Sequence, residues 1–527
     1  MKTLIYNAKI WSKSFGLKSQ KFYHVIGFDD ISGKILFLGY NENKSQVISE
    51  YDEVIDLKNK LILPSFIDGH CHLVAGAMVN SQINFRYASK PEDFMHEFIR
   101  FSKTSDDNWI VGGYFSDANF RSHFKVDKKF LDGICSSKPM FISRNDLHSC
   151  VLNSLAIKVL DIENMKKYFL QGEFYVDEFG NLTGEFFENA FTLIRKSVPQ
   201  KTAKEKSDIL KNEISRLHSF GITAVSDITF IEDLEVYKNL LEVDSLILDV
   251  DSRLPYEIFD EKEKYLNEFK NYEKKFSFKS FKAFYDGSLS SESALFKNNY
   301  QNKTNNGSRT DLVKSGEFFK LTKKILLDGY QPSVHAIGDK AVFELIEFIS
   351  DLVNSNQISD INRFRIEHVQ HLDKSDYDLF KIKNLILSVQ PAHLQFDAKI
   401  AKEKLCNPES THSYKPLIDK GIILCFGTDF PVVDISPFET IYYAMTRKVP
   451  DSGESFYPEY CFNLEDCLTA YTINNAYACF MENEKGSIEI GKFADFIVLE
   501  NDLFTSSPDE IRNLKVEMTY FKGKRVY

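Results

Sequence analysis

The sequence predicts an α/β protein whose largest part is a closed, TIM-like (β/α)8 barrel of parallel strands. Three observations lead to this fold class. Eight apolar runs of strand length lie along the middle of the chain, and most are separated by a helical pattern. Short β-type segments occupy both ends, and a domain-sized block separates the first apolar run from the second.

The two ends of the chain resemble each other in character. Residues 1–62 read as short strands separated by turn signals such as DISGK, and residues 481–527 contain GSIEIGKFADFIVLEN and VEMTYFKGKRVY. We expect a small β-sandwich domain built from both termini, with residues 1–62 as its N-terminal half and 481–527 as its C-terminal half.

The barrel is expected over residues 63–480. Its eight predicted strands are residues 66–70, 222–227, 246–253, 281–287, 332–339, 364–370, 385–391 and 422–429. The large insertion after the first barrel strand, about 80–205, is too long for a barrel loop. We therefore expect it to fold separately and to cover the mouth of the barrel.

Composition excludes several classes of protein. The net charge of the 527 residues is −11 and no basic tract occurs, so a nucleic-acid surface is not expected. No apolar window is long enough to span a membrane, the N-terminus lacks a signal-peptide pattern, and the eight cysteines form no C-x-x-C pair. A cytoplasmic protein with reduced thiols is the simplest interpretation. A nucleotide cofactor is not expected, since no glycine-rich phosphate loop appears.

The segment FIDGHCHL at residues 66–73 ends the first predicted barrel strand. Side chains alternate faces along a strand, so His70 and His72 point the same way and Cys71 points the opposite way. Two imidazoles that project together from a strand end suit a metal ion, although an isolated His-x-His also arises by chance.

Other strand ends carry the same kinds of residue. Lys282 lies in the fourth run, His335 in the fifth, His368 in the sixth and Asp429 ends the eighth. In a (β/α)8 barrel the carboxyl ends of the strands form the active face. Imidazole and carboxylate groups gathered there predict a site for a divalent transition metal.

Ten motifs spread over nearly the whole chain resemble the amidohydrolase superfamily of metal-dependent hydrolases. Within it they are most similar to the family 3 branch that includes N-substituted formamide deformylase. The motifs are LPSFIDGHCHL, RNDLHSCVLNSLAI, GNLTGEFFENA, GITAVSD, FKAFYDGSLSSESAL, VHAIGD, FRIEHVQ, SVQPAHLQFD, GTDFPV and GSIEIGKFADFIVLE. Ser65 departs from the family, which usually has glycine before the first-strand phenylalanine; the departure affects a turn and leaves the metal ligands in place.

The resemblance implies a set of metal ligands: His70, His72, Lys282, His335, His368 and Asp429. It places the first two and Asp429 on one ion, and His335 and His368 on a second. Lys282 would bridge the ions as an N-carboxylated lysine; the alternative is an ordinary ion pair with Asp286. Glu185 or Glu188 could substitute as a ligand, so the number of ions, one or two, stays open. Zinc is favoured, with manganese, iron or nickel as alternatives.

The resemblance also implies the reaction: hydrolysis of a C–N bond in a small amide, formamide or cyclic amide by a metal-activated water. Asp429 would act as general base and then as general acid, so its removal should lower the rate about 10²-fold or more. The alternatives are a hydrolase of another bond at the same site (an ester, lactone or phosphotriester), an isomerase, and a non-catalytic metal-binding relative. A homodimer is compatible with the sequence.

Three further residues are candidates for substrate binding, each with a simpler interpretation. His148 in RNDLHS is equally well explained as a surface or internally bonded histidine. His393 in QPAHL could lie at the pocket edge or be a packed core histidine, and Arg447 in AMTRKVP could line the site or form a surface ion pair.

Overall fold

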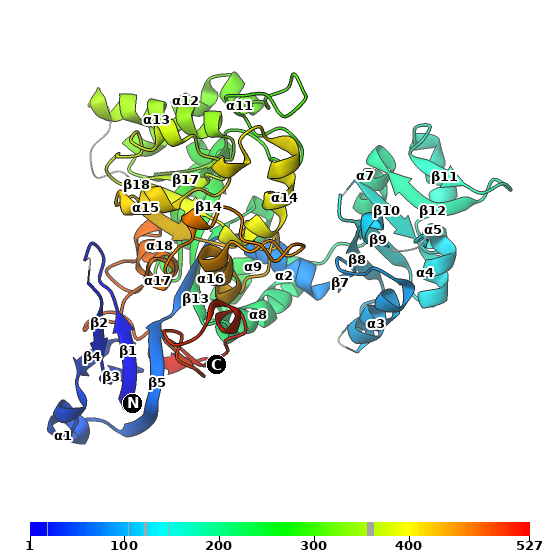
Figure 1. The fold of residues 1–527 in the computed structure, drawn as a ribbon. Coiled ribbons are helices and arrows are strands. Elements are labelled where there is room, and N and C mark those ends of the chain that lie inside the picture. The colour runs from blue at the N-terminus through cyan, green and yellow to red at the C-terminus, as the bar shows by residue number, and fades with distance from the viewer. Residues whose placement is uncertain (18, 104, 121–123, 147, 356–362) are drawn as a thin grey trace. The chain divides into compact units, whose positions relative to one another are not determined.

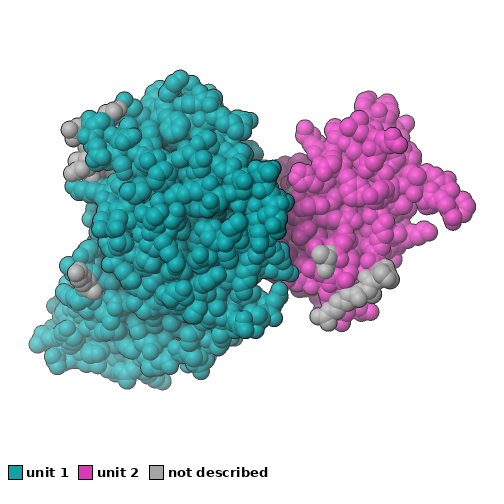
Figure 2. All heavy atoms as spheres, turned by 45° about the horizontal axis from the view of Figure 1, so that its top comes forward, with its two compact units in different colours: residues 1–73, 211–527 teal, residues 74–210 magenta. Residues whose placement is uncertain are grey.

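The computed structural model describes residues 1–527 except 18, 104, 121–123, 147 and 356–362. The chain divides into two compact units, coloured separately in Figure 2. Unit 1 comprises residues 1–73 and 211–527, and unit 2 comprises residues 74–210. The predicted insertion, about 80–205, falls within unit 2.

The core of unit 1 is a sheet of eight parallel strands (Figure 1). In order they are β6 (Phe66–Cys71), β13 (Ile222–Ile228), β14 (Asp249–Pro255), β15 (Phe276–Phe284), β16 (Gln331–Ala336), β17 (Phe364–His368), β18 (Leu385–Val389) and β19 (Ile423–Phe426). Each of the eight predicted runs overlaps one of these strands, so the predicted (β/α)8 fold class is confirmed. Nearly every residue of these strands is buried, as expected for a parallel sheet covered on both faces.

The barrel closes where β19 meets β6. The side-chain amide of Asn475 donates hydrogen bonds to the carbonyls of Ile67 and Phe426, at 2.5 and 2.8 Å, and so joins the two strands. The backbones approach so closely that a Cβ atom at Gly427 would lie 2.4 Å from the amide nitrogen of His70. Glycine at position 427 is therefore a requirement of closure.

Helices follow most of the barrel strands. They are α8 (Ala203–Ser219), α9 (Leu234–Glu242), α10 (Lys262–Phe269), α11 (Asp311–Lys314), α12 (Glu317–Leu327), α13 (Asp339–Asn354), α14 (Leu394–Lys404), α15 (Lys415–Asp419), α16 (Pro437–Thr446), α17 (Leu464–Tyr471) and α18 (Ile473–Ala478). In α13 the buried residues Val342, Leu345, Ile346 and Ile349 recur every three or four positions, which gives the helix one apolar face. No described helix is both long and apolar enough to cross a bilayer.

Strands from both ends of the chain form one connected sheet (Figure 1). They are β1 (Lys2–Ser12), β2 (Lys21–Tyr23), β3 (Val25–Asp29), β4 (Ile35–Gly39), β5 (Glu53–Pro64), β20 (Phe496–Leu499), β21 (Val516–Phe521) and β22 (Lys524–Arg525). Pairing of β5 with β20 joins the two ends, and short helices lie in the connections from β4 to β5 (α1, Lys44–Val47) and from β20 to β21 (α19, Pro508–Ile511).

This terminal sheet folds over its own core. Three strand steps separate β3 from β20, which would span about 14 Å in a flat sheet. The rings of Phe28 in β3 and Phe496 in β20 are nevertheless 5.4 Å apart. The two halves of the sheet therefore face each other around a shared apolar core, as in a sandwich.

Unit 2 is built on a sheet of its own. The strands, in spatial order, are β11 (Phe174–Val176), β12 (Leu182–Phe187), β10 (Ser149–Leu152), β9 (Met140–Arg144), β8 (Ile110–Phe115) and β7 (Ile83–Asn84). Its helices are α2 (Leu73–Ser81), α3 (Pro91–Ser102), α4 (Lys128–Ile134), α5 (Ser154–Val159), α6 (Ile162–Met165) and α7 (Glu188–Ser197). Ile142 packs into one apolar cluster and its neighbour Phe141 into another, so both faces of this sheet are covered.

Candidate functional site

Three predicted ligands meet at the closure of the barrel. The Nε2 atoms of His70 and His72 each lie 3.4 Å from Oδ1 of Asp429. Cys71 points the other way, with its sulfur 3.9 Å from the Ser226 carbonyl oxygen of the neighbouring strand. The alternation predicted for this segment is therefore observed.

Two more histidines stand beside this group. The ring of His368 is 4.8 Å from the ring of His70 and 4.5 Å from the ring of His335, measured between centroids. One ligand atom each from His70, His368 and Asp429 lies within 4.8 Å of the other two. Four different strand ends thus contribute to one cluster.

Hydrogen bonds fix which ring nitrogen of each buried histidine carries the proton. The acceptors are the Glu367 carboxylate for Nδ1 of His70 (2.5 Å), the Gln390 side-chain oxygen for Nδ1 of His368 (2.9 Å) and the Gly287 carbonyl for Nε2 of His335 (3.1 Å). Because each bonded nitrogen must donate, the other nitrogen of the ring keeps its lone pair. Nε2 of His70 is buried and makes no hydrogen bond with a described residue.

Burial keeps these rings neutral. It lowers the pKa of His70 and of His368, and it lowers the pKa of His335 to about 3, with a smaller contribution from the nearby Lys282. A neutral imidazole is the form that binds a metal ion, so the rings need no deprotonation at neutral pH.

Lys282 is buried in the same region, with 3% of its surface exposed. Its ammonium nitrogen forms no hydrogen bond or ion pair with a described residue, and burial lowers its pKa to about 7. The alternative ion pair with Asp286 is wrong. That carboxylate instead accepts hydrogen bonds from the backbone N–H groups of Leu295, Ile337 and Gly338.

Two of the clustered residues have left-handed backbones, with φ of 71° at His368 and 58° at Asp429. Non-glycine residues rarely adopt this conformation, and it is concentrated at functional sites. At His368 it has a clear effect. Regular alternation would send Glu367 and His368 to opposite faces of β17, whereas both side chains here contact His70.

The residues that support the histidines from beneath were not predicted from the sequence. Glu367 is completely buried and forms ion pairs with Arg253 (2.7 Å) and Arg365 (2.5 Å). Burial would raise the pKa of Glu367, but the two guanidinium groups outweigh it and hold the pKa well below its ordinary value. The carboxylate therefore stays charged and holds His70. A glutamate directly before a candidate ligand and arginines in two barrel strands were the available signals.

The donor set fits a transition-metal ion. It offers imidazole lone pairs, a carboxylate and an amine of lowered pKa, in a cluster where His70 Nε2 and Lys282 Nζ make no hydrogen bond with described residues. Nitrogen and oxygen donors of this kind suit zinc and related divalent ions.

His393 and Arg447 are buried residues of unit 1. His393 Nε2 lies 3.1 Å from the carbonyl oxygen of Thr428, next to Asp429 in the chain. The guanidinium of Arg447 donates to the backbone carbonyls of Phe456, His412 and Thr411. The alternative of a surface ion pair for Arg447 is therefore wrong, and substrate binding by either residue stays a prediction.

The other candidates belong to unit 2. His148 is exposed over 70% of its side chain, and its Nδ1 lies 3.3 Å from the equally exposed Glu188 carboxylate. Glu185 is buried and pairs with Arg144 and Lys125. The roles suggested for His148, Glu185 and Glu188 stay predictions.

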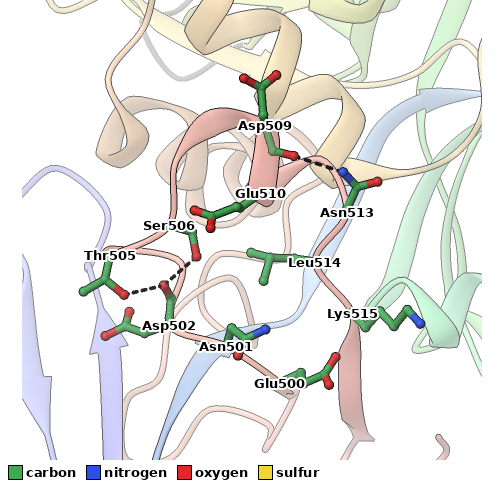
Figure 3. A pocket seen from close by; sticks show the side chains of 10 residues that line it. All are labelled: Glu500, Asn501, Asp502, Thr505, Ser506, Asp509, Glu510, Asn513, Leu514 and Lys515. Atoms are coloured by element: carbon green, nitrogen blue, oxygen red, sulfur yellow. Dashed lines mark hydrogen bonds between the residues drawn. The ribbon is translucent and has the colours of Figure 1, made fainter.

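An acidic hollow of about 640 Å³ near the C-terminus contains none of the predicted site residues (Figure 3). Three of its four acidic side chains have partners: Asp502 pairs with Lys9, Asp509 with Lys448, and Glu510 caps a short helix through Ser507. These three acidic groups therefore serve local structure.

Comparisons with known proteins give consistent results. A family model described as "Amidohydrolase family" matches residues 53–527. Protein LONG AFTER FAR-RED 3 of Arabidopsis thaliana is 27% identical, over 94% of this chain and 87% of its own length. N-substituted formamide deformylase of Arthrobacter pascens is 21% identical, over 93% of both chains. The crystal structure of an uncharacterized metal-dependent hydrolase from Pyrococcus horikoshii has a TM-score of 0.76 at 23% identity, covering 97% of this chain and 99% of that one.

Proposed function

Because the chain belongs to the amidohydrolase family, we propose that it is a metal-dependent hydrolase that cleaves the C–N bond of an amide, formamide or cyclic amide. The family resemblance predicted from the sequence motifs is confirmed by the family model. The observation that carries the proposal is the cluster at the barrel closure, where His70, His368 and Asp429 offer ligand atoms within 4.8 Å of one another.

In this proposal His70, His72 and Asp429 would hold one ion, and His335 and His368 would hold the second. The neutral form of Lys282 would add to CO₂, forming an N–C bond as one C=O π bond of CO₂ breaks and releasing one proton to solvent, and the resulting carbamate would supply anionic oxygen ligands. The lowered pKa of the lysine supports this step, since the neutral amine is the nucleophile. Zinc is the favoured metal.

A bound divalent cation supplies a water of pKa lowered towards about 7 and polarises the substrate carbonyl. The protein's own residues do the rest. Asp429 accepts a proton at its carboxylate and returns it to the departing amine nitrogen. Glu367, held ionised by Arg253 and Arg365, keeps the His70 ring in one orientation and one tautomer.

The name of the Arthrobacter relative states that it deformylates N-substituted formamides. Formamides therefore belong in the first group of substrates to be tested, beside N-acyl amines and cyclic amides.

The test combines elemental analysis of the purified protein with this panel of amides. We expect zinc or a related transition metal to co-purify, a chelator to abolish turnover, and added Zn²⁺, Mn²⁺, Fe²⁺ or Ni²⁺ to restore it. Ca²⁺ is the matched control, because it prefers oxygen ligands and should not restore turnover. The proposal fails if no transition metal co-purifies and none restores hydrolysis.

A further inference from the structure

Two phenylalanines at the carboxyl ends of barrel strands are about half exposed. Phe230 follows β13 and has 46% of its surface exposed, and Phe284 is the last residue of β15 with 47% exposed. We refer to Phe230 and Phe284 as the aromatic pair. Side chains of this size are usually more buried, so their exposure beside a candidate site calls for an explanation.

Both rings contact residues of the candidate metal centre. The ring of Phe230 is stacked on His72, with centroids 6.0 Å apart and planes inclined by 24°. The ring of Phe284 lies 5.1 Å from that of His335, and Lys282 Nζ lies 4.3 Å from its centroid. Lys282 and Phe284 are two residues apart in one strand, so they share a face.

Each ring thus has one side against the cluster and another side open to solvent. Such a surface gains free energy when an apolar group covers it. Ligand pockets are typically lined in this way, with apolar and aromatic side chains around a few polar groups.

The arginines in the described part of unit 1 point to an uncharged ligand. Arginine is the side chain best suited to hold a carboxylate, because it can donate two parallel hydrogen bonds. Every arginine in the described part of unit 1 already has an acceptor: Glu213 and Asp434 for Arg216, Glu367 for Arg253 and Arg365, Glu344 for Arg309, Glu482 for Arg363, Glu439 for Arg512, and backbone carbonyls for Arg447 and Arg525.

We propose that the aromatic pair binds an uncharged hydrocarbon group next to the scissile C–N bond, so that the preferred substrates are amides with an apolar alkyl or aryl substituent. This inference rests on the proposed function and names the substrate class of that site. Phe230 and Phe284 are then specificity-determining residues, because they contact the part of the substrate that does not react.

The test uses two amides that differ in the group next to the scissile bond, N-hexylformamide and N-formylglycine, together with the corresponding acetamides. We expect metal-loaded wild-type protein to prefer the hexyl compound in kcat/KM. Phe230→Ala and Phe284→Ala should each lower kcat/KM for it by about 10-fold or more and leave the carboxylated compound nearly unchanged. Phe230→Leu and Phe284→Leu, which keep apolar volume, should retain most of the preference.

Phe15→Ala is the matched control. Phe15 is 36% exposed and stacked on Tyr477, with centroids 4.1 Å apart. The hydroxyl of Tyr477 donates to Asn384, directly before β18, so this stacked ring lies at the opposite end of the barrel. Its removal should leave the ratio of kcat/KM values for the two amides unchanged.

The inference is overturned if wild-type protein prefers the carboxylated amides, or if the alanine variants keep the wild-type ratio. Failure of the proposed function looks different: no amide is hydrolysed with any metal. Calorimetric titration with N-hexylformamide then decides the inference separately. Weaker binding by the alanine variants than by wild-type protein supports it, and equal binding overturns it.

Discussion

Lys282 and Lys485 are almost equally buried, with 3% and 1% of their surfaces exposed, yet their environments are opposite. Lys485 forms ion pairs with Asp249 and Asp495, and Lys522 adds a second cation beside Asp249. Burial would lower the pKa of Lys485, but the two carboxylates outweigh it and raise the pKa. Burial lowers the pKa of Lys282 to about 7, with no described carboxylate paired to its ammonium.

The two lysines differ because they lie at opposite ends of the barrel. Asp249 begins β14 and Asp495 directly precedes β20, so Lys485 joins the amino end of the barrel to the terminal sheet. Lys282 lies near the carboxyl end of β15, where the candidate ligands meet. In (β/α)8 barrels the carboxyl ends of the strands serve chemistry and the amino ends serve stability. A buried lysine with paired carboxylates is structural, whereas one without them keeps a reactive amine.

The largest expected effect is a loss of catalysis, at the carboxyl end of the barrel strands. In the proposed mechanism Asp429→Asn removes the proton acceptor and one metal ligand while keeping the side-chain volume, so kcat/KM for the best amide should fall about 10²- to 10⁴-fold. The unfolding midpoint of the metal-free protein should change little. Steady-state kinetics and urea unfolding measure the two quantities. Activity near the wild-type level in metal-loaded Asp429→Asn would remove Asp429 from the mechanism.

The next largest effect is a loss of stability, at the amino end of the barrel strands. Lys485→Met leaves Asp249 and Asp495 as buried charges with too little compensation, so the free energy of unfolding should fall by about 3–5 kcal/mol. Turnover per folded molecule should be unchanged. The matched variant Lys282→Met removes an amine without a described partner and should not destabilise the metal-free protein. Equal destabilisation by the two substitutions would show that Lys282 and Lys485 do not differ in their contribution to stability.

A smaller effect is expected on the pH dependence of stability, from the buried histidine His371 and its neutral partner Thr411. Burial lowers the pKa of His371 to about 3, and its Nδ1 lies 3.1 Å from the hydroxyl of Thr411. Between about pH 6.5 and pH 3 the unfolded chain binds a proton that the folded protein does not, so this histidine makes stability fall as the pH falls. This histidine therefore lowers the free energy of unfolding at pH 5 by about 2 kcal/mol relative to pH 8.

Urea unfolding of wild-type protein and His371→Asn at both pH values isolates this contribution. Asparagine can bond Thr411 but does not titrate, so the variant should lose about 2 kcal/mol less than wild-type protein between pH 8 and pH 5. Identical losses would mean that His371 is protonated in the folded state.

The strands of the barrel were predictable because a parallel sheet covered on both faces needs continuous apolar runs. The position of Asp429 was predictable as a strand-end residue, although β19 itself stops at Phe426 and a backbone bond to His70 holds the aspartate. The contact of both Glu367 and His368 with His70 was not predictable, because it depends on the left-handed backbone at His368.

Two of the alternatives left open by the sequence are wrong. Asp286 is near Lys282 in the chain, yet it lies beyond the strand end and binds backbone N–H groups there. A surface ion pair was one of two interpretations of Arg447, whereas its guanidinium is buried among backbone carbonyls. Both outcomes depend on how loops pack over the barrel, which periodicity does not encode.

Closure between β6 and β19 has a consequence for biosynthesis. Thr428 donates its backbone N–H to Asp68 at 3.2 Å, although the two residues are 360 positions apart in the chain. The ribosome therefore makes His70 and His72 long before it makes Asp429. Contacts between such distant segments form slowly. Under the proposed function, the complete metal centre can therefore form only after most of the chain has been synthesised.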